Sequence, residues 1–197
     1  MDELNIRIAT PDDAAELSSM YRPYVESTAI TFEAADAAPT AEQFRVRIKT
    51  TLENYPWIVA QRSGEVCGYA YTGRFRARAA YDWAAETSIY VRADLRGNGI
   101  GQALNDELER ISVLQGIQNL NACVTCTDRK DDPYLTDASI RFHEKLGYRQ
   151  VGTFRSCGFK FGRWYDTCWM EKHIGPHDGD PQPFVPFSKL RDATLSK

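Results

Sequence analysis

Residues 86–104 read ETSIYVRADLRGNGIGQAL, and in this stretch a strand pattern becomes a glycine-rich turn and then a helix. From Thr87 to Val91 the residues are β-branched, small or aromatic, as in a buried strand. Apolar residues then recur at helical spacing at Ala103, Leu104, Leu108 and Ile111. The glycines of the turn, Gly97, Gly99 and Gly101, stand at alternate positions, which admits positive φ angles and a close approach of backbone to a ligand.

Such a turn is suited to bind a phosphate group. The first amides of the following helix have no backbone partner, and the helix dipole favours an anion. Arg96 adds a charge-assisted contact. A Walker loop needs Gly-Lys-Ser/Thr where Gly101 and Gln102 stand, and the dinucleotide fingerprint needs glycine at Gln102. Both loops are excluded, and a turn without a ligand stays as the alternative.

Length, composition and charge indicate one domain with a small-molecule partner. A chain of 197 residues with 43% hydrophobic residues can bury one substantial core. A net charge of −3 with dispersed basic residues offers no footprint for nucleic acid or an anionic membrane. The first residues have no signal-peptide pattern, and no stretch is long enough to span a bilayer. With five cysteines, an odd number, we expect free thiols and a cytoplasmic location.

The remaining patterns complete a mixed α/β (α+β) fold. They predict strands at 4–9, 57–62, 66–75, 120–127, 149–161 and 165–172, and helices after Pro11, at 41–52, at 99–115 and at 138–148. The strands that flank helix 99–115 should run parallel, because a crossover helix joins them. We therefore expect a central sheet of about six or seven strands with about four helices and a parallel central pair.

Two ordered signatures resemble the GNAT family, the Gcn5-related N-acetyltransferases. Residues 96–101 match R-x-x-G-x-G, the acyl-CoA pyrophosphate loop of that family, and residues 139–148, SIRFHEKLGY, resemble its second signature. The stretches AYDWAAETSIYV (80–91) and GFKFGRWYDTCWMEK (158–172) are similar to the phosphinothricin and methionine sulfoximine acetyltransferase branch. The resemblance covers about residues 5–175. It implies the GNAT fold and direct transfer of acetyl from acetyl-CoA to the α-amino group of a small amino acid or analogue.

The resemblance also implies how the chain is organised. Residues 1–175 would form the acetyltransferase domain, and residues 176–197, with several prolines, an extended tail. A homodimer is expected, with the aromatic-rich strands from Phe154 to Trp169 near the interface. A non-catalytic acyl-CoA-binding sensor or structural protein of the same fold is the alternative function.

Carried over position by position, the resemblance implies three groups of site residues. Acetyl-CoA would bind at Ile89, Tyr90, Val91, Arg96, Gly97, Asn98, Gly99, Ile100, Gly101, Gln102 and Ser139. The acceptor would bind at Arg76, Arg78 and Tyr81, and Phe32 is added because the polar loop at 27–40 that contains it can border a substrate pocket. Glu86 and His143 are the expected catalytic residues, and a backbone amide near Val91 would stabilise the negative charge on the thioester oxygen.

Each candidate has a plainer alternative. Acyl transfer to a protonated amine needs a base, and Glu86 would act through water, but it could also be a strand-edge carboxylate in a salt bridge. His143 stands where many relatives have a tyrosine and would protonate the CoA thiolate, but it could simply pack on its helix. Arg76 and Arg78, with Arg74 at the same alternation, would share one face as an acidic-substrate clamp or as solvated edge charges.

Cys123 and Cys126 form a C-x-x-C pattern without metal or redox significance. Residues three apart on a strand face opposite sides, and no second Cys or His pair follows. We expect no metal. No covalent cysteine is needed either, because the resemblance implies direct transfer.

Overall fold

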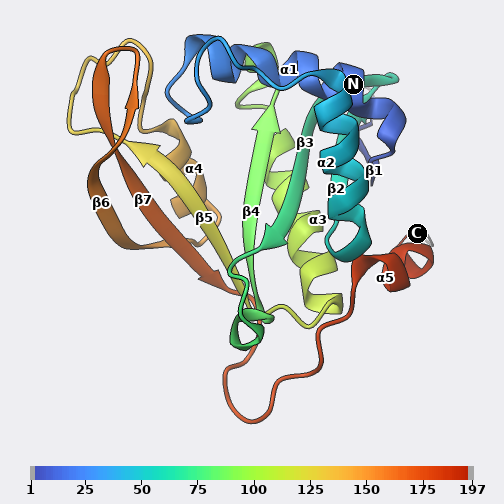
Figure 1. The fold of residues 1–197 in the computed structure, drawn as a ribbon. Coiled ribbons are helices and arrows are strands. Elements are labelled where there is room, and N and C mark those ends of the chain that lie inside the picture. The colour runs from blue at the N-terminus through green and yellow to red at the C-terminus, as the bar shows by residue number, and fades with distance from the viewer. Residues whose placement is uncertain (1–2, 195–197) are drawn as a thin grey trace.

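A seven-stranded sheet forms the frame of residues 3–194, the part of the chain that the computed structural model describes (Figure 1). The strands are β1 (Asn5–Ile8), β2 (Trp57–Arg62), β3 (Glu65–Arg74), β4 (Ala84–Val91), β5 (Asn119–Cys126), β6 (Arg149–Lys160) and β7 (Arg163–His173). Their order is β1-β2-β3-β4-β5-β7-β6, and β4 and β5 are parallel while all other neighbours are antiparallel. The predicted mixed sheet with a parallel central pair is confirmed.

Helices cover both faces of this sheet. They are α1 (Ala14–Ser27), α2 (Ala41–Asn54), α3 (Ile100–Leu114), α4 (Ala138–Lys145) and α5 (Phe187–Thr194). Alternation along β2 explains the two layers, because Trp57 and Val59 pack with α1 and α2 while Ile58 packs with α3. Helix α2 begins at a capping box in which the Thr40 hydroxyl accepts from the Gln43 amide at 3.2 Å.

The central strands separate soon after they meet. The parallel register joins three residue pairs, from Ala84–Asn119 to Glu86–Asn121, within the described chain. Beyond Glu86 the two strands diverge towards their carboxyl ends (Figure 1). Ligands bind beside the carboxyl ends of parallel strands, so this divergence marks the region where a site is expected.

The segment 176–197 differs from the expected extended tail, because it carries α5 and enters the core. Phe187 is fully buried in the cluster formed by α3 and the sheet. Val185 pairs with Gln115 at the end of α3, and the indole N–H of Trp83 donates to the Gln182 carbonyl at 2.7 Å. A single buried apolar residue such as Phe187 produces no periodicity in the sequence. The pattern of this segment therefore predicted an extended tail. Residues 1–2 and 195–197 of the expected domain and tail lie outside the described residues.

Phe187→Ala should lower the free energy of unfolding by about 3–5 kcal/mol, because it leaves a cavity against α3. Urea denaturation would measure the change. Val46→Ala on α2 is the control, since its side chain is 56% exposed and the expected change is within about 0.5 kcal/mol. A Phe187→Ala protein as stable as the wild type would show that the tail is not part of the core.

Candidate active site

The glycine turn has the backbone that its sequence predicts. Gly97 and Gly99 have φ angles of 81° and 77°, in the left-handed region, and Gly99 is the N-cap of α3. A Cβ at either position would meet nothing within 4 Å, so the backbone angle rather than lack of space requires glycine there. The first turn of α3 has no acidic residue, and Asn98, Gly99 and Gln102 are exposed. The start of α3 is therefore open to an anion.

Gly101 serves a different purpose from the other two glycines. A Cβ there would lie 3.0 Å from the ring of Phe142 on α4, so glycine allows α3 and α4 to approach closely. Ile100, next to it, is buried in the core. A groove of about 660 Å³, between α1 and the segment 92–96, includes Arg96 at the start of the turn. A second groove, of about 510 Å³, lies between the end of β5 and the start of α4.

At the end of β4, backbone groups rather than side chains are available to contact a ligand. The side chains of Ile89 and Val91 pack towards α3, and that of Tyr90 packs towards α1. The N–H of Arg92 donates to the Cys67 carbonyl of β3 at 2.9 Å. Because N–H groups alternate along a strand, the Val91 N–H points away from β3, to the side on which β5 diverges. The Val91 carbonyl points the same way and accepts from the Tyr24 hydroxyl.

Glu86 is half-buried at the point where β4 and β5 separate. Burial raises the pKa of its carboxyl group, and the positive charge of Arg76 opposes this effect. Its proton affinity is therefore higher than that of an ordinary surface glutamate, which suits a general base. Residues directly opposite each other in a ladder share a face, so Glu86 lies on the side of Asn121 and Cys123 of β5 and Trp169 of β7.

The three alternating arginines do not share one face, in contrast to the expectation from an extended backbone. β3 ends at Arg74, which pairs with Asp82 at 2.9 Å, and a bend follows. The guanidinium of Arg76 lies over the rings of Phe75 and Trp169. Tyr81 joins the same cluster through an edge-to-face contact with Phe75. Arg76, Arg78 and Tyr81 are all exposed, and Arg78 stands at the start of a short 3-10 turn.

Phe32, from the loop between α1 and α2, lies on the same side of the sheet. Its ring lies against Gly158 of β6, where a Cβ would come within 2.2–2.8 Å of three ring carbons. The ammonium of Lys160 donates to the Thr31 carbonyl at 2.7 Å, and the Thr125 hydroxyl donates to the Ile30 carbonyl at 3.2 Å. Lys160 is buried, and this burial lowers its pKa. These contacts tie the loop of Phe32 to β5 and β6.

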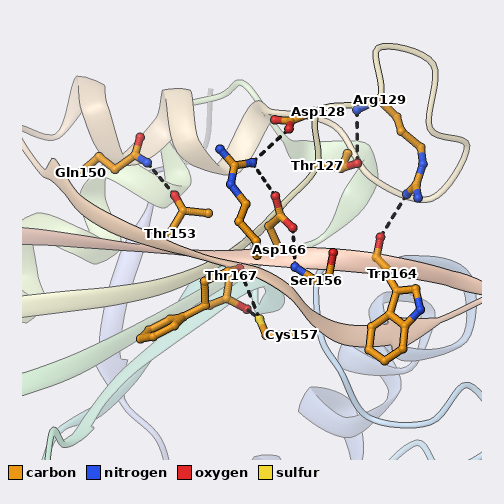
Figure 2. Close-up of polar contacts among 12 residues, drawn as sticks. Thr127, Asp128, Arg129, Gln150, Thr153, Ser156, Cys157, Trp164, Asp166 and Thr167 are labelled. Carbon is orange, nitrogen blue, oxygen red and sulfur yellow. Dashed lines mark hydrogen bonds and ion pairs between the residues drawn. The ribbon is translucent and has the colours of Figure 1, made fainter.

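A bulge in β6 brings Gly158 to this position. The register between β6 and β7 shifts between Phe154 and Gly158, and Ser156 has a φ angle of 48°. Asp166 of β7 accepts from the Ser156 amide at 2.7 Å and from the guanidinium of Arg155 at 2.7 Å (Figure 2). Cys157, inside the bulge, donates to the Thr167 hydroxyl at 3.1 Å. The bulge is therefore held by side chains of β7.

His143 is buried on α4, away from the acceptor side chains. Its Nδ1 lies 2.8 Å from the Ser139 carbonyl, and its ring meets that of Tyr148 edge-to-face. A carbonyl only accepts, so Nδ1 carries the proton in the neutral ring, and Nε2 has none to give. Burial lowers the pKa of the imidazole, which keeps it neutral at pH 7. This geometry favours the packing role of His143 over the general-acid role.

Sequence reasoning missed Trp169, Phe75 and Lys160 as neighbours of the residues expected to bind the acceptor. All three lie in or next to strands with ordinary patterns, and only the pairing of β3, β5, β6 and β7 brings them together. Cys123 and Cys126 lie on opposite faces of β5, as predicted. Within residues 3–194, no group of three or more His, Cys, Asp or Glu could hold a metal ion, and no helix is long and apolar enough to cross a membrane.

Comparisons with known proteins agree with this geometry. A sequence profile described as the acetyltransferase (GNAT) domain matches residues 6–169. Phosphinothricin N-acetyltransferase of Streptomyces viridochromogenes is 30% identical over 95% of this chain and 96% of that protein. The L-methionine sulfoximine/L-methionine sulfone acetyltransferase of Pseudomonas aeruginosa is 32% identical over 90% of this chain and 98% of its own length.

Solved structures show the same relationship. The phosphinothricin acetyltransferase of Sinorhizobium meliloti, in complex with AcCoA, superposes with a TM-score of 0.82 at 32% identity, over 94% of this chain and 97% of that chain. A second structure, a putative acetyltransferase from Salmonella typhimurium with its cofactor acetyl-CoA, has a TM-score of 0.80 at 27% identity, over 90% and 98% of the two chains.

Gly158→Ala should displace Phe32, because the new methyl group overlaps its ring. Because Phe32 is 42% exposed and its ring can move outwards, we expect a loss of about 1 kcal/mol in the free energy of unfolding, measured by urea denaturation. In a Phe32→Ala background the same substitution should cost much less. Gly152→Ala on the same strand is the control, since its Cβ would meet nothing within 4 Å. Equal losses with and without Phe32 would contradict the contact.

Proposed function

Because the chain belongs to the GNAT acetyltransferase family, we propose that it transfers the acetyl group of acetyl-CoA to the α-amino group of a small amino acid or amino-acid analogue. The observation that carries this proposal is the placement of a half-buried glutamate, Glu86, where β4 and β5 separate, at one end of a strand whose other end leads into the glycine turn. Phosphinothricin and methionine sulfoximine, named for the relatives, are the model acceptors.

The residues present fit acetyl-CoA. Gly97 and Gly99 hold the left-handed backbone of an anion-binding turn, the start of α3 is free of acidic side chains, and Arg96 lies beside it, over the ring of Tyr24. We assign the pyrophosphate to this turn and the pantetheine arm to the side of β4 on which the Val91 N–H points. Acetyl-CoA supplies the activated acyl group.

The chain's own groups then act on the acceptor. Glu86 takes a proton from the ammonium group through water, which frees the nitrogen lone pair for attack. The Val91 N–H is placed to donate to the oxygen that becomes negative during the attack. His143 acts as a packing residue in this scheme, because its proton at neutral pH is directed at Ser139. No cysteine takes part, and partial desolvation together with the nearby Glu86 carboxylate raises the pKa of the Cys123 thiol to about 11, which keeps it protonated.

The acceptor side group should meet Arg76 and Tyr81. Arg76 has guanidinium donors for a carboxylate, phosphinate or sulfoximine group, and Phe32 closes the opposite side. Arg78 stands at the exposed edge of the same segment and is a second candidate contact. Polyamines should be poor acceptors, because Arg76 would repel a second cation.

A non-catalytic acyl-CoA sensor of the same fold is the alternative function. A sensor does not need a base with raised proton affinity, so the environment of Glu86 favours the enzyme. Thiol release from acetyl-CoA in the presence of a panel of amino acids separates the two, because a sensor binds acetyl-CoA without releasing CoA.

We also propose a domain at residues 1–175 with the segment 176–197 packed on it, and a cytoplasmic location. The burial of Phe187 supports the close packing of the segment. Support for the location comes from the cysteines, because all five carry free thiols, as is usual in a reducing compartment.

Glu86→Gln should lower kcat/KM by at least about a hundredfold, the usual size of a general-base contribution, while leaving acetyl-CoA binding intact. In the wild type, kcat/KM should fall as the pH drops through the raised pKa of Glu86, because the base must be ionised. Steady-state kinetics from pH 5 to 9 would measure both effects. Full activity of Glu86→Gln over this range would refute the assigned role.

Gly99→Val is the matched test of the turn, because a β-branched residue does not tolerate a φ angle of 77°. It should abolish the thermal stabilisation that acetyl-CoA gives the wild type. Gly179→Val, in the loop after β7 with the same φ angle of 77°, controls for strain and should keep that stabilisation. Unchanged stabilisation of Gly99→Val would place acetyl-CoA elsewhere.

A homodimer is proposed from the β6–β7 hairpin. Large apolar side chains there are exposed to 55–62%, at Val151, Phe154, Phe159 and Trp164. A second copy of the hairpin would bury them. Light scattering at micromolar concentration should give twice the chain mass of 22.3 kDa, and Phe159→Glu should give the monomer. Val113→Glu on α3, 51% exposed, should stay dimeric. A wild-type monomer would refute the dimer.

A further inference from the structure

Two aromatic rings from different parts of the chain hold the guanidinium of Arg76. Its central carbon lies 4.2 Å from the ring centre of Phe75 and 5.0 Å from that of Trp169 on β7. The two rings meet edge-to-face, with centres 5.6 Å apart and planes at 81°. Nη1 of Arg76 donates to the Phe75 carbonyl at 2.7 Å. Since β3 has ended at Arg74, the ring of Trp169 supplies the long-range contact that places this guanidinium.

Trp169 stands on the acceptor side of the sheet. It is directly opposite Cys123 in the β5–β7 ladder, and Cys123 is two residues from Asn121, which is opposite Glu86. Opposite residues share a face and alternate residues repeat it, so Trp169 and Glu86 line the same side. The sheet therefore brings the guanidinium of Arg76 and the carboxylate of Glu86 to one site from different strands.

The titratable groups around Glu86 come from three elements. Arg76 acts from the bend after β3, Tyr71 from β3 itself and Cys123 from β5. Burial raises the pKa values of the Tyr71 phenol and the Cys123 thiol, so both groups are neutral at pH 7. Arg76 is thus the charged group of this set, and its position decides both the local field at Glu86 and the binding of an anionic acceptor.

We propose that Trp169 is a positioning residue for acceptor recognition, which holds the Arg76 guanidinium where an anionic side group of the amino acid and the Glu86 carboxylate meet. This inference rests on the proposed function. Tryptophan is the ring that attracts a cation most strongly, and phenylalanine keeps a weaker form of the contact. Leucine removes the π face but keeps an apolar side chain in β7. The three side chains at position 169 therefore form a graded series.

Trp169→Leu should raise KM for phosphinothricin about threefold to fivefold, the size of a cation–π contact at an exposed site, since Arg76 is exposed. KM for acetyl-CoA should stay within about twofold, and the shift should be smaller for methionine sulfone, whose side group has no net charge. Trp169→Phe should recover most of the loss. The acid limb of kcat/KM should move to higher pH in Trp169→Leu, because Arg76 no longer favours ionised Glu86.

Arg76→Ala completes a double-mutant cycle. If Trp169 acts through Arg76, then Arg76→Ala should raise KM for phosphinothricin at least as much, and adding Trp169→Leu should cause no further rise. Additive losses in the double variant, equal losses for both acceptors and acetyl-CoA, or a wild-type KM in Trp169→Leu would each overturn the proposal.

Calorimetry with phosphinothricin separates this inference from the proposed function. If the wild type releases no CoA with any amino acid, the proposed function fails, yet binding can still be compared between wild type, Trp169→Leu and Trp169→Phe. Weaker binding in Trp169→Leu with recovery in Trp169→Phe supports the positioning role. No binding to the wild type, or equal binding to all three proteins, overturns it.

Discussion

The parallel pairing of β4 and β5 ends, in the described chain, after three residue pairs, and the rest of the site depends on this limit. If the ladder continued, β5 would form hydrogen bonds with every N–H and C=O group on that edge of β4. No backbone donor would then be left for a ligand. Because β5 departs after Glu86, the Val91 N–H points to that edge, and the glycine turn follows directly. One interruption in a hydrogen-bond ladder therefore leaves open the edge of β4 between Glu86 at one end and the glycine turn at the other.

The acceptor side depends on contacts between segments far apart in sequence. Lys160 holds the loop that carries Phe32, across 129 residues, and Trp169 lies against Arg76. The β6–β7 hairpin supplies Lys160, Gly158 and Trp169, and its bulge is fixed by Asp166. The hairpin thus contributes both to the proposed acceptor site and to the proposed interface.

The segment after β7 packs against the end of the sheet at which β4 begins. Phe187 enters the core beneath α3, and the Gln182 carbonyl accepts from Trp83, three residues before Glu86. The buried ring of Phe187 and the hydrogen bonds at Gln182 and Val185 hold this segment against the sheet. The chain after residue 175 therefore packs against the start of β4 and helps to hold it in place.

The sequence by itself determined the local features of this protein. Alternation and helical spacing predicted the strands and most helices, and the glycine spacing predicted positive φ angles at Gly97 and Gly99. These features depend on backbone sterics and side-chain period, which a short stretch contains. Only the tertiary structure decided the burial of His143, the place of Trp169 beside Arg76 and the anchoring of Phe187. These depend on strand pairing and on which distant side chain fills a given space, and no local pattern specifies either.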